Sequence, residues 1–408
     1  MSDFSLYLHI PFCGHRCSYC DFNTYAGLQG LIPDYVRSLC REIEFSAESF
    51  GAAPEVHTIF FGGGTPSLLP IPELERILNA IQGYFSLRND LELTLEANPG
   101  TVSLDYLRDL HALGVNRLSL GMQSANTEEL ILLERQHDVQ DVILAVKWAR
   151  QAGFDNLNLD LIFGLPYQEM GTWQRTINFA LNLNPDHFSL YALTLEHGTP
   201  MQHWTARGLL PEADPDLAAE MYEWASERLE ALGYAQYEIS NWGKRRSDGQ
   251  TIACRHNLQY WRSLPYLGYG AGAHGFADHV RVANVLPPAV YIRRLSLGST
   301  LNKRDRNGTS GRGKLNFPRT PATSSSQNLD RRTEIGETMM MGLRLTEEGI
   351  SAGEFQRRFG QELKSVYPDE IRELIEVGLL EWSGTGDVRL RLTPKGRLLG
   401  NQVFMRFI

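Results

Sequence analysis

The 408-residue sequence predicts an α/β protein built around parallel strands. Two observations favour this class. Six short apolar runs, rich in β-branched residues, alternate with amphipathic stretches, and a polar or glycine-rich cluster follows each of the first five runs. Strand and helix units in series give parallel strands joined by right-handed crossovers. Such strands form an open doubly wound sheet or a full or partial barrel, and in both cases ligands bind at the carboxyl ends of the strands.

The expected elements follow one another regularly along the first part of the chain. Strands are expected at 6–10, 56–61, 91–96, 117–120, 157–161 and 187–193. Helices are expected at 33–50, 72–84, 104–113, 139–152, 173–183 and 214–232, with a short strand at 237–240. The segment 254–274 is rich in aromatic residues and glycine, so we expect it to cover or extend the barrel. These elements predict a first domain over 1–235 and its extension over 236–295.

The composition changes after residue 295. Ser, Thr, Gly, Asn, Lys and Arg dominate 296–333, and a segment with few aliphatic side chains cannot bury enough surface to order itself. This predicts a flexible linker or insertion. Residues 334–408 offer short helices followed by a β-hairpin, which is the pattern of a small winged-helix-like α+β domain. Its basic residues are interspersed with acidic ones, so the pattern favours substrate covering or partner docking over DNA binding.

Charge and composition argue against several functional classes, although a local basic patch stays open. A formal net charge of −9 leaves no basic excess for binding nucleic acid or an anionic membrane surface. No apolar run approaches the about 18 residues of a membrane span, and the first residues do not have the pattern of a signal peptide. We therefore expect a cytoplasmic protein. Five cysteines, three of them crowded together, favour metal or redox chemistry over a secreted disulfide framework.

The crowded cysteines lie in the stretch HIPFCGHRCSYCDF at positions 9–22. Cys13, Cys17 and Cys20 are spaced so that one loop can bring all three thiolates to one inorganic centre. A structural zinc ion and a [4Fe–4S] cluster each need four protein ligands to be fully coordinated, so three thiolates leave one metal position open to a substrate. The alternative is a zinc site completed by His9 or His15.

Further candidate residues follow the other strands. Gly63, Gly64 and Thr65 end the second strand, where glycines allow the backbone to approach a ligand closely. The others offer what an amino acid joined to a ribose requires, namely acceptors for an ammonium and two hydroxyls and a guanidinium for a carboxylate. They are Glu96, Gln123, Arg135 and Asp160. The alternative is that each carboxylate caps a helix and the arginine faces water.

Longer strings around these residues resemble the radical S-adenosylmethionine (SAM) superfamily: YLHIPFC, CSYCDF, FGGGTPS, RLSLGMQS, NLDLIFGLP and RHNLQYW. The resemblance implies a partial (β/α)6 TIM-like barrel, with a [4Fe–4S] cluster on Cys13, Cys17 and Cys20 and SAM at the open iron. It also implies a set of SAM contacts, with Tyr19 beside the adenine. By position in these strings the contacts are Tyr7, Tyr19, Gly63, Gly64, Thr65, Glu96, Gln123, Arg135 and Asp160.

Within the superfamily the strings are similar to the branch of oxygen-independent coproporphyrinogen III oxidases and HemW-type heme chaperones. Two departures favour the chaperones. Phe22 stands where the oxidase motif has a further cysteine, and the first strand begins without the N-terminal extension of the oxidases. The chaperone resemblance implies heme as cargo and its transfer to an acceptor protein, which can be membrane-associated. Whether the chain is an enzyme stays open, with porphyrinogen decarboxylation, heme ring opening and methyl transfer as alternatives.

The string HNLQYW contains a candidate heme ligand. A neutral imidazole is a good axial ligand for heme iron, so His256 is a candidate contact. The alternative is that His256 and Asn257 stabilise a turn while the neighbouring aromatic residues pack on the barrel. Cys254 is a second possible ligand or an inert buried thiol.

Overall fold

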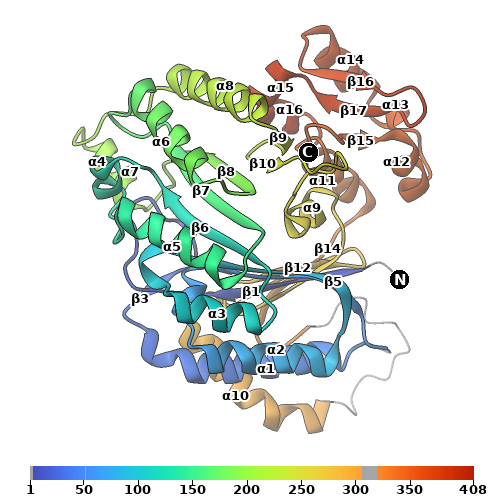
Figure 1. Cartoon of the computed structure of the whole chain (residues 1–408). Helices are drawn as coiled ribbons and strands as arrows, with labels where there is room; N and C mark the ends of the chain where they lie inside the picture. Colours follow the sequence, from blue (N-terminus) through green and yellow to red (C-terminus); the bar gives the residue numbers. More distant parts are fainter. Residues whose placement is uncertain (1–2, 51, 306–318) are drawn as a thin grey trace.

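The computed structural model describes residues 3–50, 52–305 and 319–408. Within these residues a mixed sheet of twelve strands forms the larger part of the molecule (Figure 1). Six of its strands are parallel and adjacent in chain order, as the sequence predicts. They are β1 (Phe4–Ile10), β4 (Glu55–Gly63), β5 (Ser86–Ala97), β6 (Arg117–Gln123), β7 (Leu157–Phe163) and β8 (His187–Ala192). Because β1 and β8 are not paired with each other in this described part, the barrel is partial.

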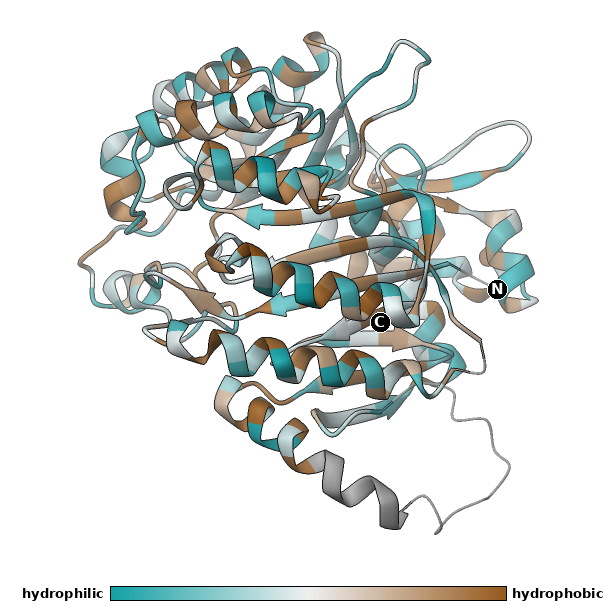
Figure 2. Ribbon diagram, turned by 60° about the horizontal axis from the view of Figure 1, so that its bottom comes forward, coloured by the Kyte–Doolittle hydropathy of each residue, from teal (hydrophilic) through white to brown (hydrophobic). Residues whose placement is uncertain are grey.

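Helices on the outside cover these strands, each amphipathic with its apolar side on the sheet (Figure 2). For example, a capping box between Asp138 and Asp141 begins α5, and Gly153 at φ 102° ends it. The helices are α1 (Ile32–Ala47), α2 (Ile71–Tyr84), α3 (Leu104–Ala112), α5 (Val139–Ala152), α6 (Met170–Asn182) and α8 (Pro215–Ala231). Two shorter helices that the sequence analysis did not predict are α4 (Thr127–Leu132) and α7 (Pro200–Ala206).

Both edges of the six-stranded unit are extended. Beyond β8 lie β10 (Asn241–Lys244) and β9 (Tyr234–Glu238), which are antiparallel. Beyond β1, the segment after α9 (Arg255–Trp261) supplies a further parallel strand, β11 (Tyr266–Tyr269), and then antiparallel β12 (His274–Ala277) and β13 (Val280–Asn284). The aromatic- and glycine-rich segment therefore extends the sheet.

The predicted flexible linker over 296–333 is partly wrong. Helix α10 (Pro288–Asp305) runs into it, and β14 (Thr323–Asn328) pairs along β13 as the outermost strand. The remaining residues 306–318 lie outside the described residues. Serine-rich β14 is ordered by its backbone hydrogen bonds to β13, and Ala322 just before it is fully buried. A prediction based on side-chain burial could not detect order that backbone pairing provides.

The C-terminal part has its own apolar core. Helix α11 (Arg331–Gly342) leads into it, and α12 (Ala352–Phe359) and α14 (Pro368–Glu376) pack against a small antiparallel sheet. The sheet order is β15-β17-β16, with β15 (Ile350–Ser351), β17 (Arg389–Leu392) and β16 (Leu380–Ser383). The smaller helices here are α13 (Leu363–Val366), α15 (Pro394–Leu398) and α16 (Gly400–Phe404). Helices followed by a β-hairpin agree with the predicted winged-helix-like pattern. In the described chain, none of the helices is both long and apolar enough to cross a membrane.

Candidate functional site

The three-cysteine loop lies at the carboxyl end of β1. A two-residue strand pair brackets it, with Phe12 beside Tyr25 and Cys13 beside Ala26. Cys13 is buried, whereas Cys17 and Cys20 are partly exposed, and Cys20 N–H donates to Cys17 C=O at 3.2 Å. The loop therefore holds its three thiols near the end of the strand.

Two of these thiols have a threonine hydroxyl as a neighbour. Thr65 Oγ1 lies 3.7 Å from Cys13 Sγ, and Thr24 Oγ1 lies 3.9 Å from Cys20 Sγ. Burial raises the pKa of the Cys13 and Cys20 thiols. Because a thiol must lose its proton to bind a metal, a metal centre here would displace protons that the protein alone retains.

The two other cysteines lie elsewhere. Cys40 is on α1, where its thiol donates to the Arg76 carbonyl at 3.7 Å, and burial raises its pKa to about 11. Cys254 is fully buried beside Glu92, and burial raises its pKa to about 12. Both thiols are protonated at neutral pH and are separate from the loop.

The histidines that would complete a zinc site are engaged in other contacts. His9 bonds Tyr7 Oη through Nδ1 and the Asn23 carbonyl through Nε2, both at 3.0 Å. His15 Nε2 lies 3.5 Å from a Glu134 carboxylate oxygen. Within the described residues, no three His, Cys, Asp or Glu side chains are arranged to hold one ion. For either histidine to complete a zinc site, its present contacts would have to break.

The glycine-rich end of β4 packs closely on the cysteine loop. Gly64 N–H donates to the Ile10 carbonyl and Thr65 N–H to the Phe12 carbonyl, both at 2.8 Å. A Cβ on Gly64 would lie 2.7 Å from Phe12 O and 3.1 Å from Cys13 Sγ. Gly63 has φ 113°, a conformation that glycine adopts without strain. Glycine is therefore required here for close approach of two backbones.

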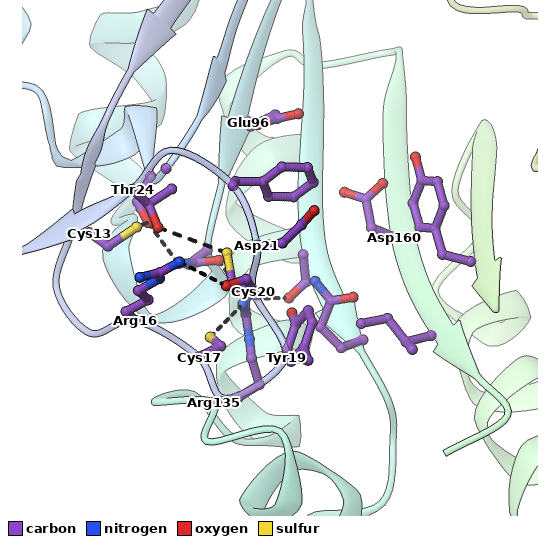
Figure 3. Close-up of a pocket in the computed structure, with 18 of the residues that line it drawn as sticks. Cys13, Arg16, Cys17, Tyr19, Cys20, Asp21, Thr24, Glu96, Arg135 and Asp160 are labelled. Carbon is purple, nitrogen blue, oxygen red and sulfur yellow. Dashed lines mark hydrogen bonds between the residues drawn. The ribbon is translucent and has the colours of Figure 1, made fainter. Parts of the chain in front are cut away.

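Of the four carboxyl groups that line the cavity in front of this loop, Glu96 and Asp160 are the two that are not exposed (Figure 3). Glu96 ends β5 and accepts a hydrogen bond from Gly63 N–H at 3.1 Å. Burial and then the nearby Asp160 raise the Glu96 pKa to about 8. Asp160 on β7 accepts bonds from Ser119 Oγ and Asn158 Nδ2, both at 2.9 Å, and burial raises its pKa. A ligand with a cationic group or hydroxyls would therefore interact favourably with these two carboxyl groups.

Two arginines line the cavity, and Arg135 is less exposed than Arg16. Arg135 follows α4 in the chain, and its Nη2 donates to Gly121 C=O at 3.0 Å and to Asn98 Oδ1. Its Nη1 lies 3.5 Å from Cys17 Sγ, and its Nε is buried without a hydrogen-bond partner. The guanidinium is therefore held in place and keeps one donor unused.

Eleven of the thirteen predicted site residues line one cavity of about 360 Å³. They are Cys13, Cys17, Tyr19, Cys20, Gly63, Gly64, Thr65, Glu96, Gln123, Arg135 and Asp160. The sequence analysis missed several lining residues, although Asn98 stands in a polar cluster at a strand end that it noted. Those missed are Arg16, Asp21, Thr24, Asn98, Ser119, Tyr191 and Glu196.

Tyr7 lies just behind this cavity. A Cβ on Gly62 would be 3.1 Å from Tyr7 Cε2 and 3.2 Å from Glu96 Oε2, so Tyr7 is a neighbour of Glu96 across the glycine. Burial raises the Tyr7 pKa, and its hydroxyl is bonded to His9. Tyr7 instead lines a second cavity.

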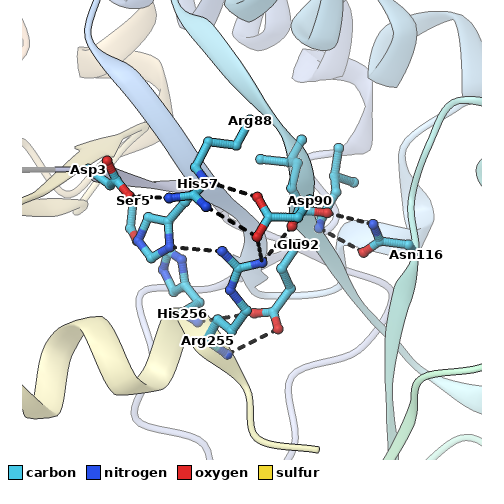
Figure 4. A network of polar contacts seen from close by, with 11 residues as sticks. Asp3, Ser5, His57, Arg88, Asp90, Glu92, Asn116, Arg255 and His256 are labelled. Atoms are coloured by element: carbon cyan, nitrogen blue, oxygen red, sulfur yellow. Dashed lines mark hydrogen bonds and ion pairs between the residues drawn. The ribbon is translucent and has the colours of Figure 1, made fainter.

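His256 is placed differently from the prediction. It is 1% exposed at the start of α9, with Nδ1 bonded to Thr58 Oγ1 at 2.8 Å and Nε2 to Tyr260 Oη at 2.9 Å. Glu92 accepts its backbone N–H at 3.0 Å (Figure 4). Burial lowers the His256 pKa to about 3. Since both ring nitrogens are engaged, the arrangement favours the alternative of a structural histidine, and binding of heme iron would require both bonds to break.

The first cavity fits the groups that the motif implies. Three thiols from one loop leave a metal position for a ligand, and a glycine backbone borders them without Cβ atoms. Arg135 has an unpartnered donor for a carboxylate, and Glu96 and Asp160 offer acceptors on the other side. This donor set suits an amino acid joined to a ribose better than it suits a bare metal ion.

The fold and this cavity define the chain as a radical SAM protein. The sequence profile of the Radical SAM superfamily matches residues 7–180, and that of the HemN C-terminal domain matches residues 329–399. Membership of the superfamily implies a [4Fe–4S] cluster and SAM.

Similarity over the full length narrows the class. The chain is 36% identical over 405 residues to the heme chaperone HemW of Bacillus subtilis, covering 99% of each chain. It is 42% identical over 273 residues to the heme chaperone HemW of Escherichia coli, covering 66% of this chain and 69% of that one. The chain belongs to the HemW family.

A solved structure agrees with the fold. Coproporphyrinogen III oxidase HemN from Escherichia coli matches with a TM-score of 0.79 and 24% identity, covering 99% of this chain and 90% of that one. The predicted α/β radical SAM fold with its mostly parallel sheet is confirmed.

Proposed function

We propose that this protein binds heme and passes it to an acceptor protein, with a [4Fe–4S] cluster on Cys13, Cys17 and Cys20 and SAM beside it. The observation that carries the proposal is the cavity in which three thiols from one loop face a glycine backbone, a guanidinium and two acids. Relatives named heme chaperone HemW, similar along the whole chain, support the choice of heme as cargo.

Different residues of the cavity bind different groups of SAM. Arg135, oriented by Asn98 and Gly121, binds the carboxylate of SAM. Glu96 accepts a hydrogen bond from the ammonium group. Asp160, oriented by Ser119 and Asn158, accepts a ribose hydroxyl. When bound, the cluster would supply the electron for cleavage of the sulfonium C–S bond. Tyr19 packs at the side of the loop, within the same cavity.

The decisive experiment is a heme titration of protein reconstituted anaerobically with iron and sulfide, with and without SAM. We expect a Soret band that saturates with heme. Transfer is then measured by mixing heme-loaded protein with heme-depleted membrane proteins, separating the two, and following the Soret band in each fraction. A protein that never develops a Soret band would not be a heme carrier.

The oxidase alternative has its own assay. Under anaerobic conditions with SAM and a reductant, an oxidase would convert coproporphyrinogen III to its decarboxylated product. We expect no conversion, because Phe22, 63% exposed, stands at the position where the oxidase motif has a cysteine. Conversion at the rate of a true oxidase would replace the carrier proposal.

A further inference from the structure

A second cavity of about 600 Å³ lies between the sheet edge beyond β1 and helix α11. It is larger than the first, and its volume is within the about 300–1,000 Å³ typical of ligand pockets. Its lining is mostly apolar and rich in aromatic side chains, which suits a large conjugated ring. The aromatic and sulfur-bearing lining residues are Tyr7, Phe22, Tyr260, Trp261, Tyr266, Phe276, Met340 and Met341.

This cavity contains side chains of the types that serve as axial ligands of heme iron in other proteins. His274 on β12 is an exposed residue, and among the described residues no hydrogen bond holds its ring nitrogens. Partial shielding of the ring from water, and then the nearby Arg281, lower its pKa, which favours the neutral imidazole at pH 7. Met340 and Met341 line the cavity from α11. Neutral imidazole and thioether sulfur are the axial ligands of many electron-transfer hemes.

The cavity also has polar groups for the propionates of heme. Arg281 on β13 lines it and is paired with Glu337 of α11. Three lining residues, Trp261, Ser263 and Thr338, each have a buried donor without a hydrogen-bond partner. Unpaired buried donors are costly. These three residues line the cavity together with Arg281, and Arg281 is the group that a propionate would contact.

The second cavity adjoins the first through the cysteine loop. Asp21 and Phe22 line both cavities. The next residue, Asn23, donates through Nδ2 to the carbonyls of Ala271 and Leu286, each at 3.0 Å. The loop that carries the three thiols is therefore fastened to the turn that precedes His274.

We propose that heme binds in this second cavity, with His274 as an axial ligand of the iron and a methionine of α11 as the other. This inference rests on the proposed function, since it assigns the cargo site of the heme carrier. In this proposal the histidine that contacts the iron is His274 and not His256, the candidate from the sequence. Heme in this position would touch the cysteine loop at Phe22.

The test compares heme binding by full-length reconstituted protein and three variants. His274→Ala and the double variant Met340→Leu/Met341→Leu should each weaken heme binding by about 10-fold or more. Electron paramagnetic resonance of ferric heme should change from low-spin to high-spin in both. His111→Ala is the matched control, because His111 is an exposed histidine on α3 that lines neither cavity.

Circular dichroism and iron content establish that the variants fold and load the cluster. If His274→Ala does not fold, His274→Gln, which keeps a polar side chain of similar length, replaces it. Wild-type affinity and spin state in all cavity variants, together with heme binding by the wild type, would overturn the site and leave the carrier function intact. A wild type that binds no heme would overturn both.

Discussion

The Arg135 guanidinium lies 3.5 Å from the Cys17 thiol, measured from Nη1 to Sγ, although 118 residues separate them in the sequence. The contact joins the loop after β1 to the segment after α4. It places a positively charged guanidinium next to one of the three thiols of the loop. The cysteine motif and Arg135 are thus parts of one site rather than two.

The first prediction concerns cluster loading. Cys17→Ala removes one of three thiols, and we expect the reconstituted protein to lose most of its iron and its visible absorption. Cys40→Ala is the control, because Cys40 lies on α1 away from the loop and should load iron normally. Equal iron in both variants would contradict the assignment of the loop. Iron content and sulfide are measured per chain.

The second prediction concerns Arg135. Arg135→Gln removes a charged donor, and a hydrogen bond to a charged group contributes about 1.5–3 kcal/mol, so SAM affinity should fall by about 10-fold or more. Arg37→Gln is the control, since Arg37 forms only an exposed pair with Asp34. Calorimetric titration of the cluster-loaded protein with SAM measures both. Unchanged affinity in Arg135→Gln would remove Arg135 from the site.

The third prediction is a pH effect at Glu96. Its pKa is raised to about 8, so the carboxyl is mostly protonated at pH 7 in the free protein. An ammonium bound beside it favours the carboxylate and lowers that pKa. Binding of SAM at pH 7 should therefore release protons, and the release should vanish above pH 9, where the carboxyl is already ionised. Titration in buffers of different ionisation enthalpy measures this release.

Glu96→Gln is the variant that isolates this effect. It keeps the shape of the side chain but has no proton to release, so its binding enthalpy should not depend on the buffer. Proton release of wild-type size in Glu96→Gln would show that another group titrates.

The fourth prediction concerns Gly64. A Cβ there would lie 2.7 Å from Phe12 O and 2.9 Å from Ile10 O, so Gly64→Ala should destabilise the fold by about 1–3 kcal/mol and reduce cluster loading. Gly83→Ala is the control, because Gly83 lies inside α2 with open space around it and should gain about 0.5–1 kcal/mol. Denaturant unfolding followed by circular dichroism compares the two. A stable Gly64→Ala protein would contradict the close approach.

The sequence predicts the central strands and outer helices well, because buried parallel strands are continuous apolar runs and the helices are amphipathic. It also predicts most of the cavity, since strand ends of one parallel sheet meet at one edge. It does not predict that His256 is bonded on both sides by Thr58 and Tyr260, because those partners come from distant elements. Nor does it predict that His274 and α11, which are distant in the chain, line the same cavity.

Helices α4 and α7 were missed for a local reason. They have 6 and 7 residues, and about two turns are too few to show the helical spacing of apolar residues. The pairing of β14 was missed because its side chains are polar, and only its backbone hydrogen bonds to β13 make it a strand of the sheet.

Strand β14 has a consequence for truncation of the chain. It is the last strand of the sheet, and its serine-rich sequence gives the sheet a hydrophilic border. A shortened protein lacking 320–330 would leave the N–H and C=O groups of β13 unpaired along an open edge, which is a template for strand addition between molecules. Such a protein would be prone to self-association, so a segment that reads as dispensable protects the molecule from aggregation.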